Sequence, residues 1–146
     1  FQSLVVCSFF LFLFAIFLML GCKKERIEMN LYDKGGEWNI KEYYVSARSE
    51  NPNVDSYFEK MYDFGKMTFQ NGGQFRMELG QDEEVTFYVG SFHVEKSKLI
   101  LTSNAISEEF KMTWTKNNVH LSREIIDYDG SGYKYVYRVE YKLKKY

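Results

Sequence analysis

The sequence is poor in the residues that mark several common protein classes. Its 146 residues include one proline, two histidines and two cysteines, and 19 Lys and Arg nearly balance 20 Asp and Glu, for a formal net charge of −1. Without a basic excess, the composition does not favour a nucleic-acid partner. A zinc site needs three or four converging ligands, and two histidines supply too few. We therefore expect neither nucleic-acid binding nor a metal site.

Catalytic and nucleotide-binding motifs are also missing. The sequence has no Gly-x-Ser-x-Gly, no Walker loop and no dinucleotide-binding fingerprint. The acid pair Glu83-Glu84 lies beside an expected turn, where solvated charges help solubility. Residues 127–132 begin like a calcium loop, but Arg138 occupies the position of the final glutamate ligand. We interpret this stretch as a hairpin turn, and we expect a protein that is not an enzyme and holds no cofactor.

The most apolar stretch of the chain is an uncharged run at residues 4–20, which ends at Gly21-Cys22 and is followed by two lysines. The run is long for the core of a signal peptide and short for a membrane span. A small residue and a cysteine at its edge favour a cleaved signal. An uncleaved membrane anchor, with the lysines as its cytoplasmic flank, remains the alternative. No basic residue precedes the run, so we expect the natural start to lie upstream of the printed sequence.

Residues 19–22, Met-Leu-Gly-Cys, resemble the lipobox of bacterial lipoproteins, and the Lys-Lys-Glu after Cys22 resembles a surface-export signal of the Bacteroidetes. The resemblance implies that residues 1–21 are removed and that Cys22 is lipidated. More than one acyl chain anchors a protein stably, because each buried CH₂ contributes about 0.8 kcal/mol. We therefore expect an outer-membrane lipoprotein, periplasmic or surface-exposed, held in the membrane by Cys22. Residues 22–34 would be its tether and residues 35–146 its folded domain.

The only other cysteine, Cys7, lies within the expected signal. It would leave with residues 1–21, so the mature chain would hold a single cysteine and no internal disulfide. Lipidation explains why Cys22 has no second cysteine with which to form a disulfide.

Beyond Trp38 the chain alternates apolar and polar residues with a period of two, which is typical of half-buried strands. The last segment is the clearest, with an aromatic face and a charged face. Asn71-Gly72-Gly73 predicts a tight hairpin turn. The inward phase set by Val85, Phe87 and Val89 changes at Gly90-Ser91, which predicts a bulge or a barrel corner. The expected strands lie at 40–45, 66–70, 74–79, 85–94, 99–101, 110–114, 119–125 and 133–143, with 46–56 as a loop and 57–62 as a short helix or strand.

About eight strands with short turns and no crossover helices predict an all-β antiparallel protein. An up-and-down β-barrel and a two-sheet sandwich both fit this pattern. Gly36-Glu37-Trp38, before the first strand, resembles the Gly-x-Trp of lipocalins, and residues 67–75 resemble a hairpin of bacterial lipocalin-like lipoproteins. The resemblance implies an eight-stranded barrel over residues 35–146, with Trp38 plugging its closed end. It also implies that an arginine on a late strand lies across Trp38. Arg138 is the candidate by strand order, and Arg123 is the candidate by its position on the inward face of its strand.

The resemblance further implies that the barrel binds a small hydrophobic or amphipathic molecule in its lumen. The same inward stripe would also serve a packed core. The alternative is therefore a protein-interaction, assembly or inhibitor module of the cell envelope with a solid barrel. A continuous cavity would favour the first function, and a filled lumen with an exposed apolar patch would favour the second. The candidate lumen residues are Trp38, Phe69, Phe75, Met77, Phe87, Met112, Trp114, Tyr135 and Tyr137.

Overall fold

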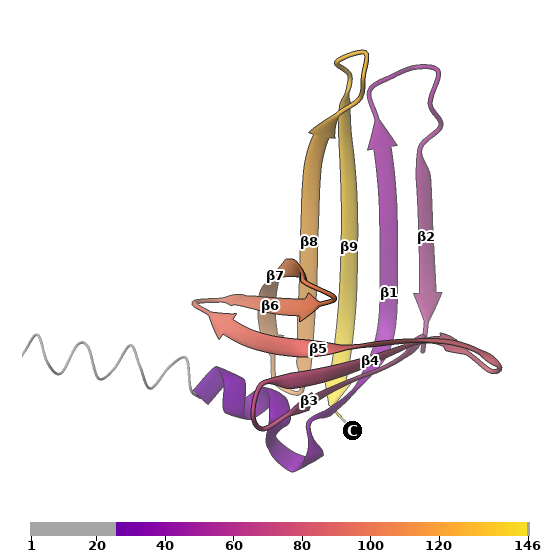
Figure 1. The fold of residues 1–146 in the computed structure, drawn as a ribbon. Helices are drawn as coiled ribbons and strands as arrows, with labels where there is room; N and C mark the ends of the chain where they lie inside the picture. Colours follow the sequence, from indigo (N-terminus) through magenta and orange to yellow (C-terminus); the bar gives the residue numbers. More distant parts are fainter. Residues whose placement is uncertain (1–25, 146) are drawn as a thin grey trace, which may run out of the picture.

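A computed structural model describes residues 26–145, which form a closed antiparallel β-barrel with one additional strand and a short N-terminal helix (Figure 1). Eight strands close the barrel in the order β1-β3-β4-β5-β6-β7-β8-β9, because β9 pairs back onto β1. The predicted barrel is therefore confirmed, and the two-sheet alternative is wrong. The strands are β1 (Glu37–Ser49), β2 (Tyr57–Tyr62), β3 (Gly65–Gln70), β4 (Gln74–Gln81), β5 (Glu84–Glu95), β6 (Lys98–Ser103), β7 (Ile106–Thr115), β8 (Asn118–Tyr128) and β9 (Lys134–Lys145).

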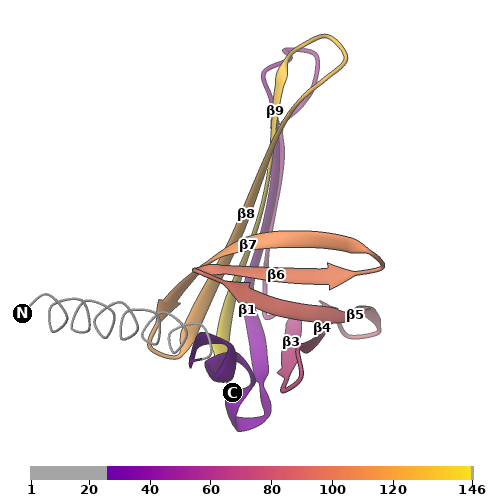
Figure 2. The same ribbon diagram turned by 60° about the vertical axis from the view of Figure 1, so that its left-hand side comes forward.

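Strand β1 is long enough to pair with three other strands. One of its edges pairs first with β3, at Glu37–Asn39, and then with β2, at Glu42–Ala47. Its other edge pairs with β9 over nearly the whole strand. The second half of β1, with β2 and the adjoining halves of β8 and β9, extends beyond the barrel wall as a four-stranded sheet. We call this sheet, residues 43–62 and 123–138, the arm; Figures 1 and 2 show it as a single layer above β5, β6 and β7.

A β-bulge marks the point where β1 enters the arm. Ile40 pairs with Leu143 and Glu42 pairs with Lys142, so Lys41 is one residue too many. A bulge bends its strand and changes which residues face inward. The inward set accordingly passes from Trp38 and Ile40 to Tyr43, Val45 and Ala47, as their pairing with inward residues of β9 shows. The loop predicted at 46–56 was therefore placed too early, since β1 continues to Ser49.

Apolar side chains fill the barrel below the arm. The buried residues form one contiguous cluster, within which the rings of Phe69 and Phe92 meet edge to face at 5.0 Å. Gly90 is part of this packing. A Cβ atom on Gly90 would lie 2.0 Å from the Thr102 carbonyl oxygen and 2.9 Å from the Phe75 ring. Gly90 therefore allows β5 and β6 to approach closely. The register with β4 is continuous through Gly90 and Ser91, so of the two predicted alternatives, a bulge or a barrel corner, the bulge is wrong.

The N-terminal helix, residues 26–32, closes one end of the barrel together with a 3₁₀ turn at Asp33–Gly35. Leu31 is fully buried, Ile27 packs against the same core, and the Leu31 carbonyl accepts a hydrogen bond of 2.8 Å from Trp38 Nε1. The Glu28 carboxylate accepts a bond of 3.0 Å from the Val94 N–H. This part of the predicted tether is thus packed onto the barrel, because the i, i+4 spacing of Ile27 and Leu31 gives the helix an apolar face.

Within residues 26–145, no helix has the length and apolarity that crossing a bilayer requires. The predicted signal, Cys7 and the predicted lipidation site Cys22 lie outside the described residues.

The two hairpin tips of the arm are joined by a side-chain hydrogen bond. Asp129 Oδ1 accepts bonds from the backbone N–H groups of Ser131 and Tyr133, and its Oδ2 accepts a bond of 3.1 Å from the Asn51 amide. The bond from Asn51, together with the backbone donors, lowers the pKa of Asp129 below its usual value. Asp129 therefore organises the β8–β9 turn, in agreement with the hairpin-turn interpretation of residues 127–132.

Candidate functional site

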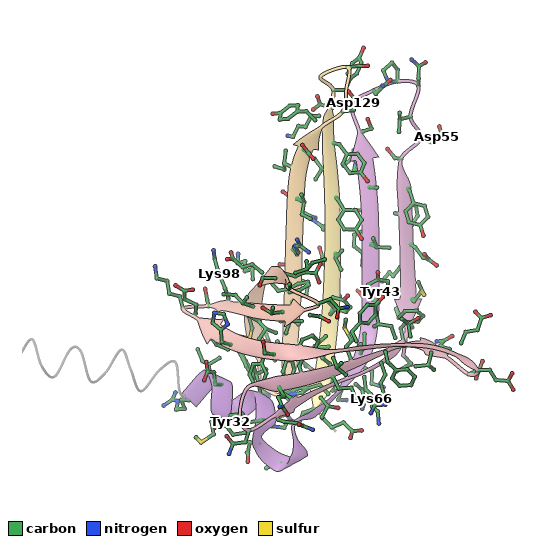
Figure 3. All side chains as sticks on the ribbon, viewed as in Figure 1. Tyr32, Tyr43, Asp55, Lys66, Lys98 and Asp129 are labelled. Carbon is green, nitrogen blue, oxygen red and sulfur yellow. The ribbon has the colours of Figure 1, made fainter. Side chains whose placement is uncertain are left out.

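A cleft opens at the end of the barrel opposite the N-terminal helix, between the inner face of the arm and the β4–β5 hairpin. Its volume is about 790 Å³, within the range of small-molecule sites. Tyr43 lines the cleft, and Figure 3 shows it where the upright strand β1 approaches β4 and β5. The cleft is lined by Tyr43, Val45, Tyr57, Glu59, Met61, Phe64, Leu79, Gly80, Gln81, Glu83, Glu84, Val85, Thr86, Tyr88 and Tyr137.

A continuous series of aromatic rings joins the cleft to the core. The Phe64 ring stacks on Tyr43 with centroids 5.4 Å apart, and Tyr43 lies 5.2 Å from Tyr141. Tyr141 in turn meets Phe110 at 5.8 Å. Each such pair contributes roughly 0.5–1.5 kcal/mol beyond the area that it buries. The cleft is therefore continuous with the apolar core, and the aromatic rings at its base are fixed by their packing on core residues.

The position of Phe64 follows from the break between β2 and β3. The N–H groups of Asp63 and Phe64 bond to the carbonyls of Lys41 and Ile40, at the bulge of β1. Lys41 Nζ also pairs with Asp63 Oδ1 at 2.6 Å. These bonds fix the break beside the bulge and leave the Phe64 ring stacked on Tyr43 in the cleft.

The hydroxyl groups of Tyr43 and Tyr57 in the cleft are protonated at neutral pH. Burial, followed by the nearby Tyr137 and Glu59, raises the pKa of Tyr43 to about 12. Tyr57 donates a hydrogen bond to the Glu59 carboxylate, which raises the pKa of Tyr57. Tyr43 can therefore donate a hydrogen bond to a ligand, whereas Tyr57 already donates its hydroxyl hydrogen to Glu59. Both hydroxyls stay protonated near neutral pH and so do not act as bases.

The rim of the cleft is acidic. Glu59 comes from β2, and Glu83 and Glu84 come from the β4–β5 hairpin on the opposite side. None of the three takes part in an ion pair with another residue of the described range 26–145. The residues that line the cleft in this range include no Lys or Arg.

Most of the candidate lumen residues lie in the packed core below the cleft. Phe69, Phe75, Met77 and Met112 are buried within the apolar cluster. Tyr137 alone among the nine candidates lines the open-end cleft. Tyr135 shares the inner face of the arm with Tyr137, further from the barrel, because residues two apart on a strand face the same side.

Phe87 lies on the outside of the barrel, where it is 56% exposed, so its predicted place in the lumen is wrong. Met77 pairs with Tyr88 and Phe75 pairs with Gly90, which places Tyr88 on the inner face and Phe87 on the outer face. The Arg76 guanidinium lies 4.9 Å from the centre of the Phe87 ring and covers part of it.

Trp38 and Trp114 lie at the closed end, far along the strands from the cleft. Trp38 is 1% exposed, as expected of a plug, and meets Trp114 edge to face at 5.8 Å. The cation over Trp38 is Lys145, with Nζ 5.1 Å from the ring centre. The expected arginines both pair with glutamates instead, Arg123 with Glu108 and Arg138 with Glu124.

The aromatic and methionine side chains of the cleft that the sequence analysis missed are Tyr43, Tyr57, Met61, Phe64 and Tyr88. Tyr43 shares the phase of Val45, so alternation alone could have placed it inward. Tyr88 lies in a segment with apolar side chains in both phases, where only the pairing with β4 shows that it faces inward. Tyr57 and Met61 could not be placed before the strand character of β2 was known. Phe64 lies in a break between strands, where no period applies.

Among residues 26–145, no group of three or more His, Cys, Asp and Glu side chains is arranged to hold a metal ion. No family model matches the sequence, and neither a curated protein nor a solved structure matches it significantly. The function must therefore be inferred from the chain's own geometry.

Proposed function

We propose that this protein binds a small amphipathic molecule in the open-end cleft. The observation that carries the proposal is a cleft of about 790 Å³ floored by stacked aromatic rings and edged with carboxylates and tyrosine hydroxyls. Small-molecule sites commonly combine such apolar walls with a few polar groups. Because the core below is packed, the ligand lies at the mouth of the barrel and not deep in its lumen.

We further propose that the domain is lipocalin-like. The closed eight-stranded barrel, the buried Trp38 of the Gly-x-Trp sequence and the cation over its ring support this. Fold alone does not establish a ligand, so the binding proposal depends on the cleft.

We propose a role in binding and not in catalysis, and no nucleic-acid partner. The raised pKa of Tyr43 keeps that hydroxyl protonated at neutral pH, so it is not available as a general base. The carboxylates at the rim would repel a phosphate backbone.

Lipid attachment at Cys22, in the outer membrane, stays part of the proposal. The helix at residues 26–32 packs on the closed end of the barrel (Figure 1). An anchor a few residues earlier would therefore hold that end toward the membrane and direct the cleft away from it. Labelling cells with a radioactive fatty acid tests the attachment. The wild-type protein should carry label and Cys22→Ala should not; equal labelling would contradict the proposal.

Binding in the cleft can be tested with a tryptophan placed inside it. Trp38 and Trp114 lie at the closed end, so they would give a constant background. Tyr137→Trp places a reporter on the cleft wall, and Tyr128→Trp places a matched control on the arm at a residue that is 65% exposed. Titration of both purified variants with 1-decanol should change the emission of Tyr137→Trp in a saturable manner and leave Tyr128→Trp unchanged. Flat titrations for both, or equal changes, would overturn the proposed site.

A second candidate function is docking of a protein partner on the arm. The arm exposes Tyr57, Phe58, Ile126 and Tyr128, and β2 pairs with the sheet along one edge only. Exposed apolar surface and a free strand edge are both typical of interaction sites. A photo-crosslinking residue at position 58 should then give one discrete product in cells, with none from the exposed position 111 on the barrel. No product at position 58 would count against this function.

A further inference from the structure

We propose that the ligand of the open-end cleft is a cation, an amphiphile with a protonated amine or quaternary ammonium head. This inference rests on the proposed binding function and adds the charge of the ligand. It is carried by two features of the same cleft, the sign of its charges and the faces of its rings.

The charges of the cleft are of one sign and come from both walls. Glu59 projects from β2, while Glu83 and Glu84 belong to the β4–β5 hairpin across the opening. None of the three forms an ion pair within the described part of the chain. A carboxylate, sulfate or phosphate head would be repelled here, whereas a cationic head would find partners on either side.

This acidity is local to the cleft. The whole chain carries a formal net charge of only −1. On the opposite face of the arm, a hollow of about 350 Å³ is lined by Arg48, Lys134 and Arg138 as well as by two glutamates. Basic residues therefore gather on one face of the arm, while the described residues that line the cleft on the other face include none.

The aromatic rings also favour a cation. Tyr43, Tyr57, Phe64, Tyr88 and Tyr137 all line the cleft, and the stacking of Phe64 on Tyr43 fixes two of the rings. The face of an aromatic ring attracts ammonium groups, most strongly when water is excluded, and cages of such rings recognise quaternary ammonium ligands. An alkyl or aryl tail would pack on Val45, Met61 and Leu79 in the same cleft.

Three ligands with the same tail test the charge. Decyltrimethylammonium, 1-decanol and decanoate, each below its micelle-forming concentration, are titrated into the purified Tyr137→Trp protein near neutral pH. We expect decyltrimethylammonium to bind about tenfold more tightly than 1-decanol, because two exposed cation–π contacts give a difference of that size. Decanoate should bind most weakly of the three. The preference should also fall as salt is raised, because exposed charges are screened.

The carboxylates are tested in the same background. Glu59→Gln, Glu83→Gln and Glu84→Gln together should weaken binding of the ammonium ligand far more than binding of 1-decanol, so that most of the preference, measured as the ratio of the two dissociation constants, is lost. A control with Glu50→Gln, Glu95→Gln and Glu109→Gln changes the net charge equally at exposed positions outside the cleft and should keep the preference.

The outcomes separate the two proposals. If 1-decanol binds but the three ligands bind equally, or if the control variant loses the preference too, the cleft is a ligand site and the cation inference is wrong. If none of the three ligands changes the emission of Tyr137→Trp, the proposed function itself fails.

Discussion

Two phenylalanines on neighbouring strands should differ sharply in their contribution to stability. Phe75 is 4% exposed inside the barrel, and Phe87 is 56% exposed on its outer wall. Replacing a buried Phe by Ala costs about 3–5 kcal/mol, through lost burial and the cavity left behind. Full burial of a Phe side chain contributes roughly 1.5–3 kcal/mol, so Phe87, which buries less than half of its surface, contributes about 1 kcal/mol. The guanidinium of Arg76 over the Phe87 ring adds about 0.5 kcal/mol.

Urea unfolding followed by tryptophan fluorescence measures both costs. Domains of this size have a free energy of unfolding of about 5–15 kcal/mol, so Phe75→Ala should shift the midpoint strongly and Phe87→Ala only slightly. Equal losses for the two variants, or a larger loss for Phe87→Ala, would refute the assignment of the inner face of β4 and β5.

Three further perturbations have expected outcomes. The pKa of Asp129 is lower in the folded protein than in the unfolded chain, where it is about 3.9, so the ionised carboxylate stabilises the arm above that pH. The melting temperature of the wild-type protein should therefore fall as the pH drops through the folded pKa. Asp129→Asn should lose the bond to Asn51 already at neutral pH. The pKa of Tyr43 is raised to about 12, so its contribution to the free energy of unfolding is present below about pH 10 and is lost as the pH rises to 12. In an alkaline absorbance titration, Tyr43→Phe should show one late-titrating tyrosine fewer than the wild-type protein. Lys145→Ala removes the cation over Trp38 and the hydrogen bond that Lys145 Nζ donates to the Asn30 carbonyl. The two losses together should cost about 1–2 kcal/mol in urea unfolding, without changing ligand binding at the opposite end.

The alternation of apolar and polar residues correctly predicted which side chains face inward wherever only every second residue of the strand is apolar. In β9, Tyr137, Val139 and Tyr141 face inward while Arg138 and Lys142 face outward, as their period indicates. Residues 85–89, Val-Thr-Phe-Tyr-Val, carry apolar side chains in both phases, so the period cannot decide between them. Pairing with β4 decides, and that long-range register is not encoded within the segment.

The candidate site was harder to predict because it depends on three departures from regular pairing. The bulge at Lys41, the break at Asp63 and Phe64, and the sharing of one β1 edge between β2 and β3 together form the cleft. The bulge at Lys41 can be recognised in the sequence, since the inward phase changes between Ile40 and Tyr43. The break at Asp63 and Phe64 and the sharing of the β1 edge depend on contacts between distant strands, which the sequence pattern does not show. Predicted lumen residues such as Phe69 accordingly lie in the packed core, and the proposed ligand site lies at the mouth of the barrel.

Methyl NMR of the protein labelled at methionine tests the central claim most directly. Met61 lines the open-end cleft, whereas Met67 and Met112 lie in the packed core, so the three methyl groups distinguish a ligand at the mouth from one in the lumen. On titration with decyltrimethylammonium, the Met61 signal should shift progressively and saturate while the Met67 and Met112 signals stay in place. Shifts at Met67 or Met112 with an unmoved Met61 would contradict a cleft at the mouth and place the ligand inside the barrel.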